Sequence, residues 1–419
     1  MGDPQRFSGR SKEVVEIAKS LHQSGVIPLI HGDRGLGKSS LALQLSRIAQ
    51  GDVELLEDIG RKDLVLTSEQ QMITFYVACE DSTKNLKGLL HLLANAVNGL
   101  KHELANEKSD SYKLVDKKTK RGLSLKIFKS ETTKKYEVSR KERSLSGLSP
   151  SETLVALCET LSEAYGQPVL FIIDELDRLK GVKGLASFLK SNAGPMLRFA
   201  LVGIGETEGQ ILKDHQSLDR QLVGVNVPIM KRSELIAIVD HTEAYLLERD
   251  LEYSFTPSAK SELARLSSGF PWFVHVIGQQ ALARAQEEGL MTIQKGMIDR
   301  AVLDLAEGRM AGQFYSLYQR AVKDSNLREY VIRLFAEWRN QDIPTSEIYP
   351  LATKLGVKNP SIYTGHLGKP IYGAVLTKSP IQGRALYRFK DEMFKVYVRI
   401  RGSLYQDVDE EVRKAFSNR

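Results

Sequence analysis

Apolar residues in the first 230 positions recur with two different spacings. Apolar residues three and four apart predict amphipathic helices, whereas short continuous apolar runs predict strands that are buried on both faces. The predicted helices cover residues 11–21, 39–49, 86–100 and 151–165, and the predicted strands cover residues 26–31, 73–78, 169–173, 197–202 and 222–227. This alternation favours a three-layer α/β domain built on a parallel sheet. Pro28 cannot donate to a sheet ladder, so we expect the paired part of the first strand to begin after it, or a bulge at it.

The pattern becomes helical after residue 228. Helices are predicted near residues 233–249, 258–267, 271–287 and 292–306. We therefore expect an all-α domain over residues 229–311, following an α/β domain over residues 1–228.

The last segment, residues 312–419, has a third pattern. Helices are predicted at residues 327–339 and 345–355, and a third helix follows a turn at 356–358, with Asn359 as its cap and Pro360 in its first turn. Two apolar runs at residues 375–376 and 385–389 then predict a hairpin. Three helices and a hairpin are typical of a winged helix-turn-helix domain.

Composition and charge narrow the function classes. The chain has no apolar run of 18 residues or more, so we expect no membrane partner, and its two cysteines exclude a disulfide scaffold. Both features favour a cytoplasmic protein. The net charge of +7 is concentrated, because residues 101–143 carry 14 basic against 7 acidic side chains, and residues 312–419 carry 18 against 11. Such clusters suit a polyanionic partner, although two solvated surfaces would have the same composition. The first cluster is interpreted as a basic insertion at about residues 101–149.

The strongest chemical signal is the segment GDRGLGKS, which lies between a predicted strand and a predicted helix. It fits the phosphate-binding P-loop pattern, in which glycines let backbone N–H groups surround phosphates. Lys38 would add a charge to the β- and γ-phosphates, and Ser39 would offer its hydroxyl to Mg²⁺. The alternative is an ordinary glycine-rich turn. The predicted cofactor-binding residues of this segment are Gly32, Asp33, Arg34, Gly35, Leu36, Gly37, Lys38, Ser39 and Ser40.

A second signal lies at the end of the apolar run VLFII, where two carboxylates follow. We expect Asp174 to hold Mg²⁺ through water and Glu175 to act as the catalytic group that polarises the attacking water. Asp177 would either help to position the metal or cap the next helix, and the cap is favoured.

With these motifs, the chain resembles STAND-type ATPases and their relatives, the AAA+ initiators of the origin-recognition type. The resemblance extends to FSGRSKE, which contains Arg10, to the GFP step that ends at Pro271, and to the segment before the last strand, which contains Arg220. It implies a parallel-sheet P-loop fold in which ATP and Mg²⁺ bind between the sheet domain and a helical lid. It also implies that Pro271 packs near the adenine, that Arg10 contacts the nucleotide or caps the loop, and that Arg220 lies near the γ-phosphate. Arg220 would either act across a subunit interface of a homo-oligomer or only pair with a nearby carboxylate.

Two departures from the family pattern change these expectations. The lid stretch GFPW lacks the arginine that the initiators keep there, which favours the STAND-like branch. The residue that senses the γ-phosphate would be Glu206 or Thr207, neither of which is the usual asparagine.

The winged helix suggests a DNA hypothesis. Residues on or after its third helix would face a groove, and basic residues in or beside the wing would reach phosphates. The alternative is that this domain only clamps the lid. The DNA-binding candidates are Ser361, Tyr363, Thr364, His366, Lys369, Lys378, Arg384, Arg388 and Lys390.

Two functions remain open from the sequence. The first is an ATP-hydrolysing switch that assembles on duplex DNA, in replication, transposition or defence against mobile elements. The second is a signalling ATPase that regulates an effector protein without contacting DNA.

Overall fold

The chain was analysed as a computed structural model, which describes residues 7–107, 148–179, 181–205, 218, 220–308, 310–338, 340–379, 385–401 and 408–417. Most of the basic insertion, the sensor candidates Glu206 and Thr207, and the wing candidate Arg384 lie outside these residues. The chain divides into two compact units. The first contains Arg10–Asp33 and Lys38–Pro228, and the second contains Arg34–Gly37 and Ile229–Arg419, each with a short N-terminal piece.

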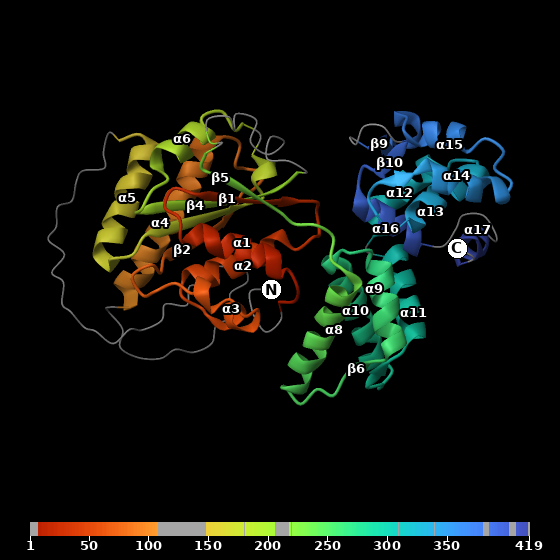
Figure 1. Ribbon diagram of the computed structural model, residues 1–419, viewed down its shortest axis with the longest axis horizontal. Coiled ribbons are helices and arrows are strands. Elements are labelled where there is room, and N and C mark those ends of the chain that lie inside the picture. Colours follow the sequence, from red (N-terminus) through yellow and green to blue (C-terminus); the bar gives the residue numbers. More distant parts are fainter. Residues whose placement is uncertain are drawn as a thin grey trace. The chain divides into compact units, whose positions relative to one another are not determined.

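The first unit is built on a five-stranded sheet with the order β2-β3-β4-β1-β5 (Figure 1). All neighbouring strands are parallel, as predicted from their continuous apolar runs. The strands are β1 (Ile27–Gly32), β2 (Ile73–Ala78), β3 (Val169–Asp174), β4 (Leu197–Ile204) and β5 (Leu222–Asn226). Because β4 lies between β1 and β3, the P-loop strand and the strand that ends in Asp174 are not neighbours.

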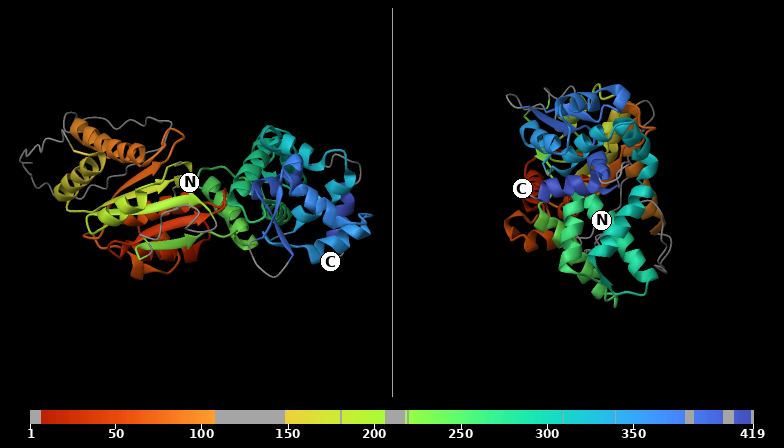
Figure 2. Two further views of the ribbon diagram at one scale, coloured as in Figure 1. Left: turned by 90° about the horizontal axis from the view of Figure 1, so that it is seen from above. Right: turned by 90° about the vertical axis from the view of Figure 1, so that its right-hand side faces the viewer.

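Helices cover both faces of this sheet, which confirms the predicted three-layer fold. On one face, α1 (Ser11–Leu21) contacts β1 and β5, and α2 (Lys38–Ala49) contacts β1, β4, β3 and β2 (Figures 1 and 2). The other face carries α4 (Leu86–Glu107), α5 (Pro150–Tyr165) and α6 (Leu185–Asn192). The connections contain the short helices α3 (Glu54–Asp58), η2 (Lys62–Leu64) and η3 (Leu176–Arg178).

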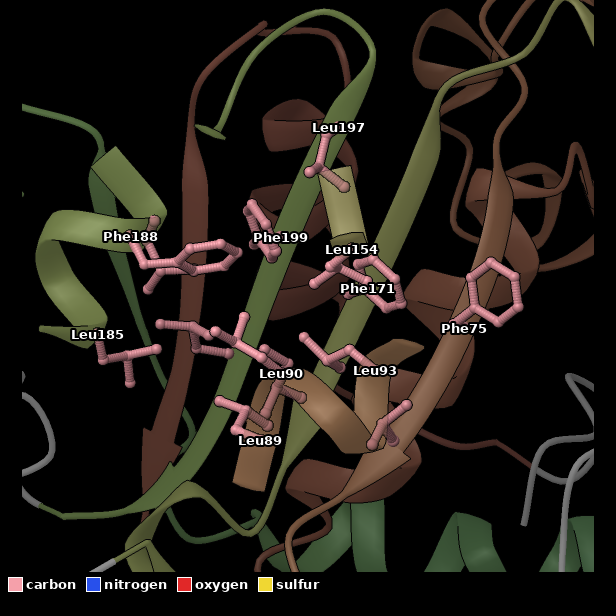
Figure 3. Close-up of a cluster of buried hydrophobic side chains, with 14 of the residues drawn as sticks. Phe75, Leu89, Leu90, Leu93, Leu154, Phe171, Leu185, Phe188, Leu197 and Phe199 are labelled. Carbon is pink, nitrogen blue, oxygen red and sulfur yellow. The ribbon is translucent and has the colours of Figure 1, made fainter. Parts of the chain in front are cut away.

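An apolar core fills the space between the sheet and α4, α5 and α6. Phe171 on β3 lies at its centre, with its ring centroid 5.3 Å from that of Phe75 on β2 and 6.1 Å from that of Phe199 on β4 (Figure 3). These stacked rings join three neighbouring strands, so the core fixes which strands lie side by side.

Pro28 lies inside β1, and the prediction that pairing begins after it is wrong. Pro28 is in register with Val223 on β5. The Ile27 N–H donates to the Gln221 carbonyl. Successive residues of a strand point their N–H groups to opposite sides, so the Pro28 nitrogen points away from β5, toward β4. Pairing with β4 begins only at Leu29, so the missing N–H of Pro28 leaves no gap in the ladder.

The first part of the second unit is mainly helical, as predicted. Its helices are α8 (Arg232–Leu247), α9 (Pro257–Ser267), α10 (Pro271–Glu287) and α11 (Lys295–Glu307). It is not purely helical, however, because β6 (Ser254–Phe255) pairs in parallel with β7 (Thr292–Ile293). Thr292 and Ile293 were expected inside the last helix, but both are β-branched and Ile293 is fully buried in the strand pair.

The remainder of the second unit contains the predicted three helices and an antiparallel sheet. The helices are α13 (Asn326–Glu337), α14 (Thr345–Lys354) and α15 (Pro360–Leu367), and the short helix η5 (Pro370–Tyr372) follows. The sheet has the order β8-β10-β9, so β8 (Ile343–Pro344) adds a third strand to the predicted hairpin of β9 (Leu376–Lys378) and β10 (Leu386–Phe389). Pro360 begins α15 as expected, but the Asn359 side chain makes no capping hydrogen bond.

Three further helices of this segment have no counterpart among the predicted elements. They are α12 (Ala311–Val322), α16 (Glu392–Ile400) and α17 (Val408–Ser417). Within the described parts of the chain, no helix has both the length and the apolar character that crossing a membrane requires.

Several cations of residues 312–419 are inside the fold. The Arg333 guanidinium, of which 4% is exposed, bonds Glu329 on its own helix and Asp409 on α17. Lys395 donates to the Asn340 carbonyl at 2.8 Å, and burial lowers the pKa of this lysine to about 8. Arg328 and Arg399 are also buried. The basic surface of this segment is therefore smaller than its composition suggests.

Candidate functional site

The P-loop connects the end of β1 to the start of α2. Gly35 and Gly37 have φ angles of 81° and 89°, which glycine adopts without strain and other residues rarely adopt. These conformations let the loop turn back over the first turn of α2. Because the first N–H groups of a helix have no partner within the helix, the loop and helix together suit an anionic ligand.

Lys38 provides the positive charge of this loop. Only 8% of the residue is exposed, and its Nζ donates to the Asp33 carbonyl at 2.6 Å. A buried ammonium group is costly without compensating polar contacts, so its position at the start of α2 is suited to a bound anion. The buried charge and the glycine conformations both fit a phosphate group.

Asp174 ends β3 and is 5% exposed. Its Oδ1 accepts the Glu175 backbone N–H at 2.6 Å, and its Oδ2 accepts the hydroxyl of Tyr76 on β2. The Ser39 side chain lies near the same phenol, where it partly opposes the rise in the pKa of Tyr76. The structure therefore places the two predicted metal ligands, Ser39 and Asp174, close to one phenol group.

Tyr76 is a site residue that the sequence analysis missed. Burial and the neighbouring Asp174 carboxylate raise the pKa of Tyr76 far above its usual value, so the phenol stays protonated and donates. One signal was present in the sequence, because Thr74 and Tyr76 are hydroxyl-bearing residues two apart in an apolar strand. Such residues share one face of the sheet, and Thr74 faces α2, where it bonds Ser46 and Gln50.

Glu175 lies in the left-handed region, with a φ angle of 54°. Non-glycine residues rarely adopt this conformation, and such strain is concentrated at functional sites. Its Oε2 pairs with the Arg178 Nε at 2.8 Å, and more than 40% of each side chain is exposed. Exposed ion pairs are weak, so breaking this contact costs little free energy.

The favoured role of Asp177 as a helix cap is wrong. Asp177 is inside η3, and its Oδ1 accepts the N–H of Ile204, the last residue of β4, at 3.0 Å. The carboxylate thus holds the end of β4 beside the end of β3. Cys79 lies nearby as a buried free thiol, and burial raises its pKa to about 11.

Three residues that the family resemblance implied have defined positions, but their roles stay predictions. Arg10 precedes α1 with a φ angle of 64° and is 5% exposed, and its Nη1 lies 4.0 Å from the Glu13 Oε1. Pro271 is the first residue of α10 and is buried. Arg220 is exposed in the turn before β5.

Some of the DNA-binding candidates have exposed side chains, whereas others are buried or bonded within the fold. Lys369 and Lys378 are exposed, as are Ser361 and Lys390. Thr364, by contrast, is fully buried and its hydroxyl donates to the Pro360 carbonyl at 3.0 Å, so the expectation that it faces a groove is wrong. It lies on the inner face of α15.

Three more candidates are engaged within the fold. Arg388 makes a two-pronged ion pair with Asp342, with Nε–Oδ1 and Nη2–Oδ2 distances of 2.5 and 2.8 Å, so its charge is already compensated. His366 stacks on Tyr372 at 5.0 Å between ring centroids, and Tyr363 packs edge-on against it. Burial and two nearby cations lower the pKa of His366, which makes it a poor partner for phosphate.

The sequence of residues 22–210 matches the AAA domain family. This part of the chain is an AAA domain. The match begins before β1 and includes the P-loop, the strand that ends in Asp174, and Glu175. These are the parts that hydrolysis of a nucleoside triphosphate requires, and the AAA domain accordingly makes the protein an ATPase.

Similar solved structures cover nearly the whole chain at low identity. The ORC2 protein of Aeropyrum pernix is 15% identical, covers 97% of this chain and 93% of its own, and has a TM-score of 0.47. The Aeropyrum pernix ORC1 protein, solved in complex with DNA, has 14% identity, coverages of 97% and 94%, and a TM-score of 0.44. The RuvB branch migration motor of Thermotoga maritima has 14% identity, coverages of 93% and 94%, and a TM-score of 0.41. These values are too low to indicate a shared function. None of the curated proteins matches the sequence.

A pair of substitutions separates ATP binding from hydrolysis in the AAA domain. Lys38→Ala removes the buried ammonium group and should weaken ATP binding by roughly 100-fold or more. Glu175→Gln keeps the shape of the site but removes the base, so ATP binding should persist while turnover falls by roughly 10²- to 10⁴-fold. Fluorescence titration with a labelled ATP analogue and a steady-state phosphate assay measure the two effects. Unchanged ATP affinity in Lys38→Ala would refute the phosphate role, and near wild-type turnover in Glu175→Gln would mean that another group is the base.

Proposed function

We propose that the protein is an ATP-driven switch of the AAA+/STAND type that binds duplex DNA through a winged helix formed by α13, α14, α15 and the β8-β10-β9 sheet. ATP binding would bias the arrangement of the lid and the winged helix, and hydrolysis would reset it. The observation that carries the DNA-binding part is the chemistry of α15. This helix has the sequence PSIYTGHL, which contains no carboxylate, and exposed lysines lie after it and on the wing.

The nucleotide part of the proposal includes Mg²⁺. Oxygen atoms are the ligands that Mg²⁺ prefers. The Asp174 carboxylate accepts the Tyr76 hydroxyl, and the Ser39 hydroxyl lies near the same phenol. When bound, Mg²⁺ would neutralise charge on the phosphates. Lys38 would hold the β- and γ-phosphates, and Glu175, once released from Arg178, would accept the proton of the attacking water.

The helix order supports a helix-turn-helix interaction with DNA. In such domains the second helix of the motif lies in the major groove, and neighbouring residues contact the backbone. Here α14 is followed by α15 after a short turn, and the outward positions of α15 include Ser361 and Gly365, both small enough to allow close approach. Lys369, Lys378 and Lys390 are exposed, so they remain candidates for phosphate contacts.

The test is the salt dependence of DNA binding and of DNA-stimulated ATP hydrolysis. Wild-type affinity for a labelled duplex should fall linearly on a log–log plot against salt, with a slope of about −0.9 for each phosphate contacted. The double variant Lys369→Glu, Lys378→Glu should bind more weakly, with a slope shallower by about two. The matched control, Lys12→Glu, Lys19→Glu, makes the same charge change at exposed positions of α1 and should leave the slope unchanged.

Equal effects of the two double variants would show that binding is diffuse and not centred on the winged helix. An ATPase rate that duplex DNA leaves unchanged at every salt concentration would favour the second candidate function, a signalling ATPase.

That second candidate is a signalling ATPase that regulates an effector protein. It is favoured by two exposed isoleucines, Ile362 on α15 and Ile371 on η5, of which 52% and 63% are exposed. Exposed large apolar side chains suit a protein-binding surface better than a phosphate-binding one.

We further propose that the protein works as a homo-oligomer in which Arg220 acts on the γ-phosphate of a neighbouring subunit. Arg220 is exposed in the turn before β5, so it is accessible to another copy. Arginine supplied in this way stabilises charge on the transferred phosphate.

Arg220→Ala should therefore bind ATP but lose roughly 10³-fold in turnover. Mixing it with Lys38→Ala, which supplies an intact Arg220, should restore part of the hydrolysis. Rates of the mixture that equal the sum of the two separate variants would contradict a shared site.

A further inference from the structure

Tyr76 lies between the two side chains that are proposed to hold the metal. Its hydroxyl donates to the Asp174 Oδ2, and the Ser39 side chain is close enough to lower the pKa of the phenol. The three residues come from three separate elements, since Tyr76 is on β2, Asp174 ends β3, and Ser39 is in the first turn of α2.

The sheet register determines where the phenol lies. Tyr76 is opposite Ile172, and Ala78 is opposite Asp174, so the phenol extends along the strand by two positions to reach the carboxylate. Side chains alternate between the faces of a sheet, so Tyr76 shares the α2 face with Thr74, while Phe75 belongs to the core on the other face. A phenylalanine at position 76 would fill the same space and lack only the donor.

The hydrogen bonds constrain Asp174 from both sides. The Glu175 N–H binds one carboxylate oxygen and the Tyr76 hydroxyl binds the other, which fixes the rotation of the carboxylate plane. Each carboxylate oxygen can accept more than one hydrogen bond, so lone pairs remain for a metal-bound water. A ligand held in this orientation before the metal arrives binds with less loss of conformational freedom.

We propose that Tyr76 is a positioning residue for the magnesium site: its hydroxyl holds the Asp174 carboxylate, beside the Ser39 hydroxyl, in the orientation that receives Mg²⁺ with the nucleotide. This inference rests on the proposed Mg²⁺ site at Ser39 and Asp174. Tyr76 touches neither the phosphates nor the attacking water in this role, so its removal should affect metal coupling and not the nucleotide itself.

The experiment measures how much Mg²⁺ strengthens nucleotide binding in the full-length protein. The affinity for a fluorescent ATP analogue is determined in excess Mg²⁺ and in EDTA, and the ratio of the two is the Mg²⁺ gain. Tyr76→Phe should leave the affinity in EDTA within about twofold of wild type and reduce the gain by roughly tenfold, since one hydrogen bond to a charged group is removed. The Mg²⁺ concentration that half-saturates binding should rise by a similar factor.

The second unit offers a matched control. Tyr318 is also a buried tyrosine whose hydroxyl donates to a carboxylate, that of Glu329. Tyr318→Phe makes the same chemical change on α12 and should lower thermal stability without changing the Mg²⁺ gain. Tyr76→His, which keeps an N–H donor, should recover part of the gain and serves as the second variant if Tyr76→Phe does not fold.

The outcomes separate this inference from the function on which it rests. A wild-type protein with no Mg²⁺ gain would overturn the proposed metal site and this inference with it. A full Mg²⁺ gain in wild type and in folded Tyr76→Phe would overturn the role of Tyr76 alone. Loss of affinity in EDTA as large as the loss in Mg²⁺ would show that Tyr76 supports the loop as a whole and would also overturn the positioning role.

Discussion

The parallel pairing of β2 with β3 is the constraint on which the site depends. Ala78 is opposite Asp174 in this pairing, and the Tyr76 hydroxyl meets the Asp174 carboxylate because of it. A slip of one residue would turn Tyr76 to the other face of the sheet and leave a buried carboxylate without its second donor. Phe171, stacked between Phe75 and Phe199, makes that slip costly because it fixes three strands through the core. The core on one face of the sheet therefore stabilises the polar site on the other.

Local spacing was enough to predict the P-loop and the end of β3 from the sequence. Phosphate binding needs glycines, a lysine and a hydroxyl at fixed positions in a short segment, so the motif is contiguous. The strands were predicted nearly to their ends for a related reason, because continuous apolar runs mark parallel strands that are covered on both faces.

Contacts between distant segments could not be predicted in the same way. Tyr76 and Asp174 are 98 residues apart, and only the strand register brings them together. Arg388 forms an ion pair with Asp342 across the small sheet. The Asp177 carboxylate accepts a hydrogen bond from the end of β4 instead of capping a helix. Thr364 shows a different limit, because α15 has apolar residues on more than one side and its sequence does not indicate which side is buried.

The distribution of charge links the fold to the proposed function. Arg328, Arg333, Lys395 and Arg399 are buried in the second unit, where they bind carboxylates and carbonyl groups and hold its helices together. The net charge of that segment therefore overstates its attraction for a polyanion. The proposed interaction with DNA would depend instead on a few exposed lysines around α15, whose arrangement would matter more than their number.

The most direct measurement of the central claim is a crystal structure of the full-length protein with a slowly hydrolysed ATP analogue and Mn²⁺ in place of Mg²⁺, with data collected at the manganese edge. We predict one anomalous peak beside the β- and γ-phosphates, about 2.1 to 2.2 Å from the Ser39 Oγ and linked to Asp174 through water, since Mn²⁺ and Mg²⁺ share octahedral oxygen coordination. Phosphates that lie outside the loop from Gly32 to Ser39, or a peak that is distant from both Ser39 and Asp174, would contradict the account.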